Sequence, residues 1–194
     1  MDLPKILRRK KSRLELKVKN KWINWNPYTS KLAAYILGNG EFWPFTDKKI
    51  ILYLGAAEGN TVNFLSHICH QGRVIAVDIS TVAMAELLKL VEKRKNIIPC
   101  LEDAHFPNKY KLQTNIPDII YQDIAQGDQI EIFIRNYEYF EPKCGFLMLK
   151  TGSIHGKKND ILEEVKHTLR KKFKIVDIVD ISKWAKGHNA YYVE

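Results

Sequence analysis

The sequence lacks the features that would place it in several common protein classes. Its three cysteines, Cys69, Cys100 and Cys144, are odd in number and widely spaced, and no C-x-x-C pair occurs. This spacing predicts neither a disulfide framework nor a zinc ribbon, so we expect three buried thiols. No apolar run approaches the ~20 residues that span a bilayer, and the charged start Met1–Lys21 contains no secretory h-region. We therefore expect a cytoplasmic protein without a membrane partner.

A metal site is also poorly supported. His67, Cys69 and His70 lie close together in the sequence. However, residues i and i+2 point apart on a helix, and no second pair of ligands stands out. A structural role for these side chains is the better interpretation, and we expect no metal.

Positive charge is abundant and unevenly placed. The chain has 31 Lys and Arg residues against 22 Asp and Glu, a net charge of +9. Met1–Lys21 holds nine of the basic residues and only two acidic ones, so most of the excess lies in a short basic N-terminal extension, residues 1–30. Leu14, Leu16 and Val18 alternate with charged residues there, which predicts a half-exposed strand. We expect the extension to contact RNA; the alternative is a solvated tail without a partner.

A glycine turn organises the rest of the chain. The apolar run Ile50–Leu54 has the length and β-branched content of a buried strand, and a helical apolar pattern begins at Val62. Between them lie Gly55 and Gly59, in the spacing G-x-x-x-G. A strand, a turn of small residues and a helix form the ligand-binding corner of an open α/β sheet. The spacing differs from dinucleotide and phosphate-binding loops and suits S-adenosylmethionine, which carries an adenosine and an amino acid but no phosphate.

Strands and helices alternate after this turn, which predicts an α/β domain over residues 31–194. A short helix, Ser30–Leu37, with Ser30 as N-cap and Gly38 after its end, precedes the first strand. The predicted strands are Ile50–Leu54, Val74–Ile79, Asn96–Cys100, Asp118–Gln122, Phe146–Lys150, Lys174–Ile181 and Ala190–Val193. The predicted helices are Val62–His70, Thr81–Lys95, Asp128–Phe140 and Asp160–Lys172, with a loop over Phe106–Asn115. We expect a mostly parallel seven-stranded sheet whose last strand is antiparallel, because no helix separates the final two strands.

Hydrogen-bonding side chains stand at the carboxyl ends of successive strands, where such a sheet binds its ligand. Asp78 can accept from two ribose hydroxyls, and Asp103 from an adenine amino group beside the small Ala104. Asp123–Gln126 would face the methyl-bearing sulfonium, and Lys150 closes the next strand. Any one carboxylate is more often a turn former, but the set after a glycine turn favours a binding site.

Six segments together resemble the fibrillarin family in its archaeal-type form: NPYTSKLAAYILG, YLGAAEGNTV, VIAVDIS, NIIPCLEDAHFPNKY, DIIYQDIAQGDQ and GFLMLK. The resemblance implies a Rossmann-like S-adenosylmethionine-dependent methyltransferase that acts on ribose 2′-hydroxyls of ribosomal RNA and, in archaea, transfer RNA. It further implies a ribonucleoprotein with a box C/D guide RNA, the substrate RNA, a Nop-type scaffold protein and a kink-turn-binding ribosomal-type protein. Such a particle is cytoplasmic in archaea and would be nucleolar only in a eukaryote.

The resemblance also implies roles for individual residues. The catalytic group it implies is Lys31, Asp123 and Lys150, with His188 as a fourth member. Lys150 is the candidate base, Lys31 would orient the hydroxyl or the adjacent phosphate, and Asp123 would hold both lysines. The implied cofactor-binding residues are Gly55, Ala57, Asn60, Thr61, Asp78, Ile79, Asp103, Ala104, Asp123, Ile124, Ala125 and Gln126.

The sequence departs from the family pattern at several of these positions. The family usually has two threonines at Asn60-Thr61 and a glutamate followed by an aromatic at Asp78-Ile79. Glu58 replaces a small residue in the turn. The region before Lys31 is shorter than the family's N-terminal β-rich domain.

Three functions stay open from the sequence: the guided ribose methyltransferase, a stand-alone FtsJ-like ribose methyltransferase, and a non-catalytic RNA-binding subunit of the same particle. The joint presence of Lys31, Asp123 and Lys150 argues against the third.

Overall fold

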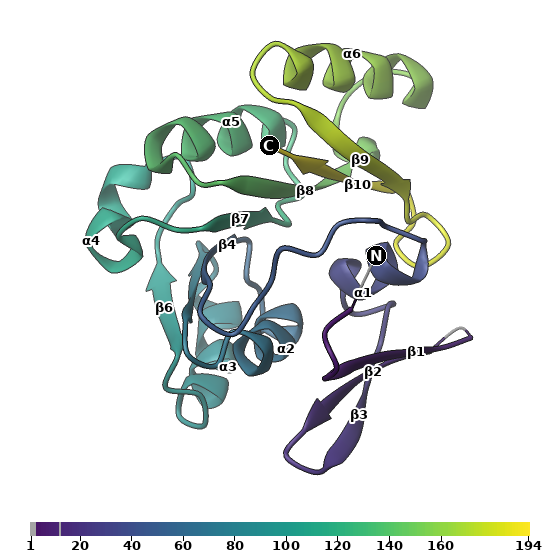
Figure 1. The fold of residues 1–194 in the computed structure, drawn as a ribbon. Coiled ribbons are helices and arrows are strands. Elements are labelled where there is room, and N and C mark those ends of the chain that lie inside the picture. Colours follow the sequence, from purple (N-terminus) through teal and green to yellow (C-terminus); the bar gives the residue numbers. More distant parts are fainter. Residues whose placement is uncertain (1–2, 12) are drawn as a thin grey trace.

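A seven-stranded sheet with helices on both faces forms most of the molecule, and a separate three-stranded sheet precedes it (Figure 1). The computed structural model describes residues 3–11 and 13–194; Met1, Asp2 and Ser12, which belong to the basic extension, lie outside the described residues. The strands are β1 (Leu7–Lys10), β2 (Arg13–Val18), β3 (Lys21–Trp25), β4 (Ile50–Leu54), β5 (Arg73–Asp78), β6 (Ile97–Leu101), β7 (Ile119–Gln122), β8 (Cys144–Lys150), β9 (Ile175–Asp180) and β10 (His188–Val193). The helices are α1 (Lys31–Leu37), α2 (Asn60–Ile68), α3 (Thr81–Val91), α4 (Lys111–Thr114), α5 (Gln129–Phe140), α6 (Lys158–Arg170) and the 3₁₀ turns η1 (Pro107–Tyr110) and η2 (Thr151–Ser153).

The large sheet has the predicted topology. Its strand order is β6-β5-β4-β7-β8-β10-β9. The pairs from β6 to β8 are parallel, and β10 runs antiparallel to both β8 and β9. The order reverses between β4 and β7, so the crevice for a ligand lies at the carboxyl ends of these central strands.

Two cores cover the two faces of this sheet. Side chains alternate along β4, so that Ile51 and Tyr53 join one core while Leu52 and Leu54 join the other. Helices α1, α2 and α3 cover the first face, and α5 and α6 cover the second (Figure 1). All three cysteines are buried free thiols, as expected. In the described part of the chain, the helices are too short or too polar to cross a bilayer.

The basic extension is a folded sheet, so the alternative of a solvated tail is wrong for its described residues. Strands β1, β2 and β3 form an antiparallel meander, of which the sequence pattern indicated only β2. Leu14, Leu16 and Trp25 are fully buried and pack in the same core as α1 and α2. Trp25 stacks on Phe64 of α2 with ring centroids 4.7 Å apart. The small sheet is therefore attached to the larger domain through apolar contact.

The predicted loop over Phe106–Asn115 contains two short helices, η1 and α4. Between them they bury only Pro107, Tyr110 and Thr114. With so few buried residues, the segment has no repeating apolar pattern from which a helix could have been predicted. The short turn η2 was also not predicted, and the other differences in the large domain are shifts of helix and strand ends by a few residues.

Candidate active site

The glycine turn after β4 needs its small residues for steric reasons. Gly55 has φ +78°, and a Cβ there would lie 2.4 Å from the carbonyl oxygen of Asp123. Ala57 also has a positive φ, +46°, which is strained for a residue with a side chain. Its amide donates to Asp78 Oδ2 at 2.7 Å, a bond that ties the turn to the end of β5. The turn therefore lies against the ends of both neighbouring strands.

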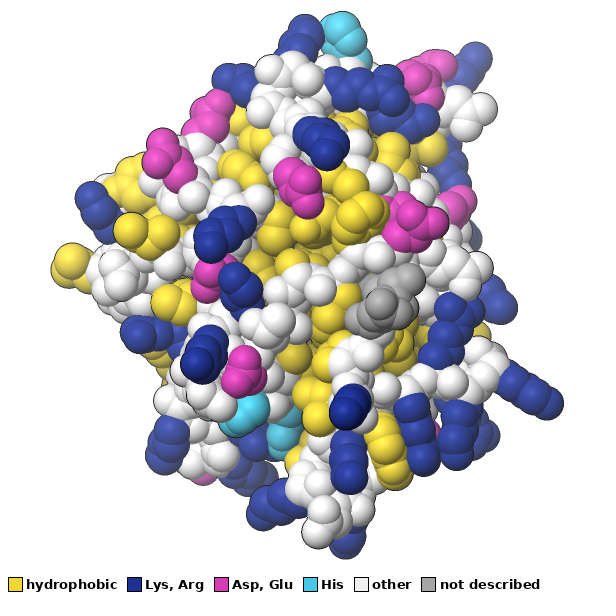
Figure 2. All heavy atoms as spheres, viewed as in Figure 1, with side chains coloured by type: hydrophobic (Ala, Val, Ile, Leu, Met, Phe, Trp, Pro, Cys, Tyr) yellow, Lys and Arg dark blue, Asp and Glu magenta, His cyan; other side chains and the backbone are white. Residues whose placement is uncertain are grey.

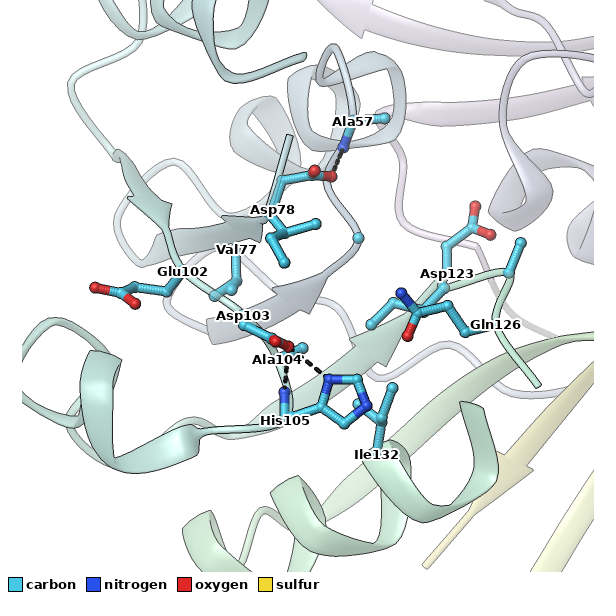
Figure 3. A pocket seen from close by; sticks show the side chains of 14 residues that line it. Ala57, Val77, Asp78, Glu102, Asp103, Ala104, His105, Asp123, Gln126 and Ile132 are labelled. Atoms are coloured by element: carbon cyan, nitrogen blue, oxygen red, sulfur yellow. Dashed lines mark hydrogen bonds and ion pairs between the residues drawn. The ribbon is translucent and has the colours of Figure 1, made fainter. Parts of the chain in front are cut away.

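A cavity opens beside this turn, at the carboxyl ends of β4, β5, β6 and β7 (Figure 3). Its walls combine four carboxylates with small and apolar side chains. The lining residues are Gly55, Ala57, Val77, Asp78, Ile79, Glu102, Asp103, Ala104, His105, Asp123, Ile124, Ala125, Gln126 and Ile132. Every cofactor-binding residue expected from the sequence lines it except Asn60 and Thr61.

Thr61 lies elsewhere and has another partner. Its side chain is 5% exposed, and its hydroxyl donates to Ser30 Oγ at 2.9 Å. Ser30 in turn caps α1 by accepting from the Ala33 amide. Thr61 thus joins the first turns of α1 and α2 and does not line the cavity. Asn60, the first residue of α2, is exposed and also lies outside the lining.

The Asp78 carboxylate keeps acceptor capacity for a ligand. Its Oδ2 accepts from the Ala57 amide and its Oδ1 from the Ser80 amide, at 2.7 and 2.8 Å. A carboxylate offers about four lone-pair sites, so one remains on each oxygen. A pair of hydroxyls, such as a ribose diol, matches that arrangement.

Asp103 is held by His105, which the sequence analysis did not include. Oδ1 of Asp103 accepts from the backbone amide of His105 at 2.9 Å and contacts ring Nδ1 at 2.6 Å (Figure 3). Burial acts to raise the pKa of the Asp103 carboxyl, but the two His105 donors outweigh it and leave that pKa below its ordinary value. Asp103 therefore faces the cavity as an ionised acceptor beside the buried Ala104.

The remaining lining residues missed from the sequence are Val77, Glu102 and Ile132. Val77 precedes Asp78 on β5, and Glu102 precedes Asp103 after β6. Both could have been predicted by including the residue before each predicted acceptor. Ile132 lies on α5, and only the packing of that helix reveals its position.

Lys31 and Asp123 form an ion pair at the edge of the cavity. Lys31 Nζ lies 2.8 Å from Oδ2 and 2.7 Å from Oδ1 of Asp123. The two side chains are 24% and 17% exposed. Lys31 is the first residue of α1, and Asp123 directly follows β7. Residues 92 positions apart in the chain are thus joined at one sheet edge.

Lys150 and His188 lie on the next strands of the sheet. Lys150 ends β8, and His188 is its register partner on β10. The expectation that Asp123 holds both lysines is wrong for this structure: among the described residues, Asp123 forms an ion pair with Lys31 and Lys150 forms none. Instead, the amide of Gln129, which is fully buried, fixes the backbone of Lys150. Gln129 Oε1 accepts from the Lys150 N–H at 2.9 Å, and its Nε2 donates to the Lys150 carbonyl at 3.1 Å.

His188 is a neutral imidazole in this setting. Burial, and then the charge of Lys31, lower the pKa of His188 below its ordinary value. Nδ1 lies 3.0 Å from the carbonyl of Lys186, which can only accept, so Nδ1 carries the proton. His188 therefore adds no charge beside the Lys31–Asp123 pair.

The cavity fits S-adenosylmethionine by the chemistry of its walls. Asp78 and Asp103 supply acceptors for hydroxyls and an amine, and Ala104, Ile79 and Ile132 supply apolar surface for a flat ring. The carboxylates also favour a cationic ligand in a chain whose net charge is +9. In the described part of the chain, no group of three or more His, Cys, Asp or Glu side chains is arranged to hold a metal.

Comparisons with known proteins agree with this geometry. The fibrillarin family model matches residues 8–194. A fibrillarin-like rRNA/tRNA 2′-O-methyltransferase of Picrophilus torridus is 40% identical over 192 residues, which cover 98% of this chain and 86% of the relative. A chain in the crystal structure of a fibrillarin/Nop5p complex superposes with a TM-score of 0.93 at 33% identity, over 100% of this chain and 99% of that one. Aeropyrum pernix fibrillarin, solved with natively bound S-adenosyl-L-methionine, superposes with a TM-score of 0.83 at 27% identity, over 94% and 89%. The chain therefore belongs to the fibrillarin family.

Proposed function

We propose that this chain is an S-adenosylmethionine-dependent RNA ribose 2′-O-methyltransferase, which modifies ribosomal and transfer RNA as the catalytic subunit of a box C/D guide ribonucleoprotein. One observation carries the proposal: Asp123 lines the acceptor-rich cavity and also forms the ion pair with Lys31. Asp123 thus connects the proposed pocket for the methyl donor with Lys31, the charged group proposed to contact the substrate. Relatives named as rRNA/tRNA 2′-O-methyltransferases support the choice of substrate.

Methyl transfer requires a methyl donor, a positioned hydroxyl and a proton acceptor. When bound, S-adenosylmethionine supplies an electrophilic methyl group on a sulfonium. A ribose 2′-hydroxyl is a poor nucleophile and needs its proton removed as it attacks. Lys31, held by Asp123, would orient the hydroxyl or the neighbouring phosphate, and such positioning contributes several kcal/mol.

Lys150 is the proposed proton acceptor. Its Nζ forms no ion pair with a carboxylate among the described residues. Its backbone is fixed on both sides by the buried amide of Gln129. A base at the end of a strand whose backbone is fixed suits a substrate that docks from outside.

The basic sheet is the proposed RNA-contacting surface. Arg8, Lys10, Arg13 and Lys17 share its outer face, because their neighbours Leu7, Leu14 and Leu16 point into the core. In Figure 2, dark blue side chains gather at the lower right, where Figure 1 places β1–β3, with little magenta among them. Lys10 lies directly opposite Arg13, and like charges in that position repel. A phosphate backbone would relieve that repulsion.

A salt titration of RNA binding tests this surface in the assembled particle. Each lost phosphate contact reduces the slope of log K against log salt by about 0.7–0.9. We expect the double variant Arg13→Gln, Lys17→Gln to reduce the slope by the amount that corresponds to one or two lost phosphate contacts. The control Lys171→Gln, at the end of α6, should leave the slope unchanged. An unchanged slope for the double variant would remove the sheet from the RNA interface.

The partners follow from the family. A Nop-type scaffold protein is the partner in the related complex structure, and we propose one here. The guide RNA and a kink-turn-binding ribosomal-type protein complete the proposed particle, which would work in the cytoplasm of an archaeon.

Mass-spectrometric mapping of 2′-O-methyl groups tests the function. We expect methylation of one target nucleotide when scaffold, kink-turn protein and guide are present, and almost none with the chain alone. Specific methylation without a guide would favour the stand-alone alternative. A particle that assembles on RNA but transfers no methyl group would favour the non-catalytic subunit.

A further inference from the structure

His105 bridges two carboxylates at the wall of the cavity. Its Nδ1 lies 2.6 Å from Asp103 Oδ1, and its Nε2 lies 2.7 Å from Asp128 Oδ2. Asp103 follows β6, whereas Asp128 directly precedes α5. The ring thus connects two segments that are 25 residues apart in the chain (128 − 103). Figure 3 shows the ring beside Asp103, with Asp123 and Gln126 across the cavity.

The bridge requires a charged imidazole. Ionised carboxylates only accept hydrogen bonds, so both ring nitrogens must donate. The bonds to Asp128 and then Asp103 raise the pKa of His105 above its ordinary value, although burial opposes this. The other charged groups nearby are Glu102, Lys109 on η1, and Arg135 on α5, whose guanidinium donates to the His105 carbonyl at 3.1 Å.

The bonds to His105 determine what the two carboxylates can still bind. Asp128 is the N-cap residue of α5, yet within the described part of the chain its side chain makes no capping bond and binds His105 instead. Asp103 places both His105 donors on Oδ1, and its Oδ2 accepts no protein hydrogen bond among the described residues. Oδ2 is therefore the oxygen left for a ligand amine.

We propose that His105 is a positioning residue for S-adenosylmethionine, which orients the Asp103 carboxylate toward the ligand and ties it to the start of α5. The proposal rests on the proposed function for the identity of the ligand. In its bridging form the ring fixes one oxygen of Asp103 and leaves the other for the adenine amino group.

The bridge makes ligand affinity depend on pH. Because the pKa of His105 is raised on folding, the bridge is present at pH values below the ordinary pKa of histidine and is lost as the pH rises through the folded value. The neutral ring has one donor, so it can keep only one carboxylate. Losing one charge-assisted hydrogen bond from the wall should weaken binding by about 5- to 10-fold.

Isothermal titration calorimetry with S-adenosylmethionine at pH 6.0 and 8.5 tests this in the full chain. For the wild type we expect about 5- to 10-fold weaker binding at the higher pH. In Asp128→Asn the amide can donate to Nε2 of a neutral ring, so the bridge persists without charge and the change should be under about 2-fold. His105→Asn cannot span both partners and should bind more weakly at both values. His155→Asn, at an exposed histidine, is the matched control and should follow the wild type.

An NMR titration of the His105 ring in the free chain gives a readout independent of the ligand. We expect the ring to titrate above its ordinary value in the wild type and lower in Asp128→Asn. Wild-type binding that is independent of pH, or a His105→Asn chain that keeps both the affinity and the pH dependence, would overturn the role of His105 alone. Absence of S-adenosylmethionine binding at either pH would overturn the proposed function as well.

Discussion

Replacing Lys31 with methionine and Asp123 with asparagine, singly and together, should reveal a strong coupling between them. The charges lie 2.7–2.8 Å apart and the side chains are about four-fifths buried. Coulomb attraction at that distance is about 6 kcal/mol for an effective dielectric constant of 20. Desolvation of both groups offsets most of this, so we expect a net coupling of about 1–3 kcal/mol.

Urea unfolding of the four chains measures the coupling. Each single variant leaves one charge partly buried without its partner, so the two single losses should sum to more than the loss in the double variant. With a slope of about 2 kcal/mol/M, the non-additivity corresponds to a midpoint difference of about 0.5–1.5 M.

A surface pair provides the control. Lys166 and Glu163 on α6 lie 2.7 Å apart, but Glu163 is 70% exposed. Their coupling should be close to zero, because water and salt screen an exposed pair. If the Lys31–Asp123 cycle gives no more than this control, the pair is not held rigidly, and the argument that Asp123 positions Lys31 fails.

Two further predictions concern the turn and the basic sheet. Gly55→Ala combines a positive φ with a Cβ placed 2.4 Å from the Asp123 carbonyl oxygen. It should therefore lower the free energy of unfolding by about 2–4 kcal/mol and abolish S-adenosylmethionine binding by calorimetry. Gly152→Ala, whose Cβ would meet no atom of the described residues within 4 Å, should leave both unchanged. Equal behaviour of the two alanine variants would contradict the steric account of the turn. Trp25→Ala should cost about 3–5 kcal/mol in urea unfolding, because the buried ring stacks on Phe64, whereas Ile23→Ala, at a side chain 43% exposed, should cost under about 1 kcal/mol. A small loss for Trp25→Ala would mean that the small sheet is not part of the core.

The sequence predicted the large sheet well because its signals are local. Continuous apolar runs such as Ile50–Leu54 are buried on both faces, and the glycine turn ends the first of them. Ser30 and Gly38 marked the ends of α1 through capping chemistry, which depends on neighbouring residues only.

The small sheet was largely missed because its inner face is not wholly apolar. On β1 the inward positions hold Leu7 and Arg9. The guanidinium of Arg9 binds the carbonyl oxygens of Ile36 and Leu37 at the end of α1, along with Asn39. In the sequence, Arg9 cannot be distinguished from a solvent-exposed basic residue, because its partners at the end of α1 are distant in the chain.

The site residues that lie at the ends of strands were predicted from the sequence. Those whose position depends on a side-chain hydrogen bond were missed or misplaced. Asp78, Asp103 and Asp123 meet because parallel strands end at one edge. By contrast, the hydroxyl of Thr61 donates to Ser30, and the ring of His105 contacts Asp128 at the start of α5. Neither partner is a neighbour in the sequence.

The most direct measurement is the single-turnover rate of methyl transfer by the reconstituted, guided particle carrying Lys150→Met. Lys150 does not line the cavity, so this variant should bind S-adenosylmethionine like the wild type. Loss of a general base should slow methyl transfer about 100-fold or more, while Lys171→Met should react at the wild-type rate. Transfer by Lys150→Met at the wild-type rate would contradict the assignment of the base on which the account depends.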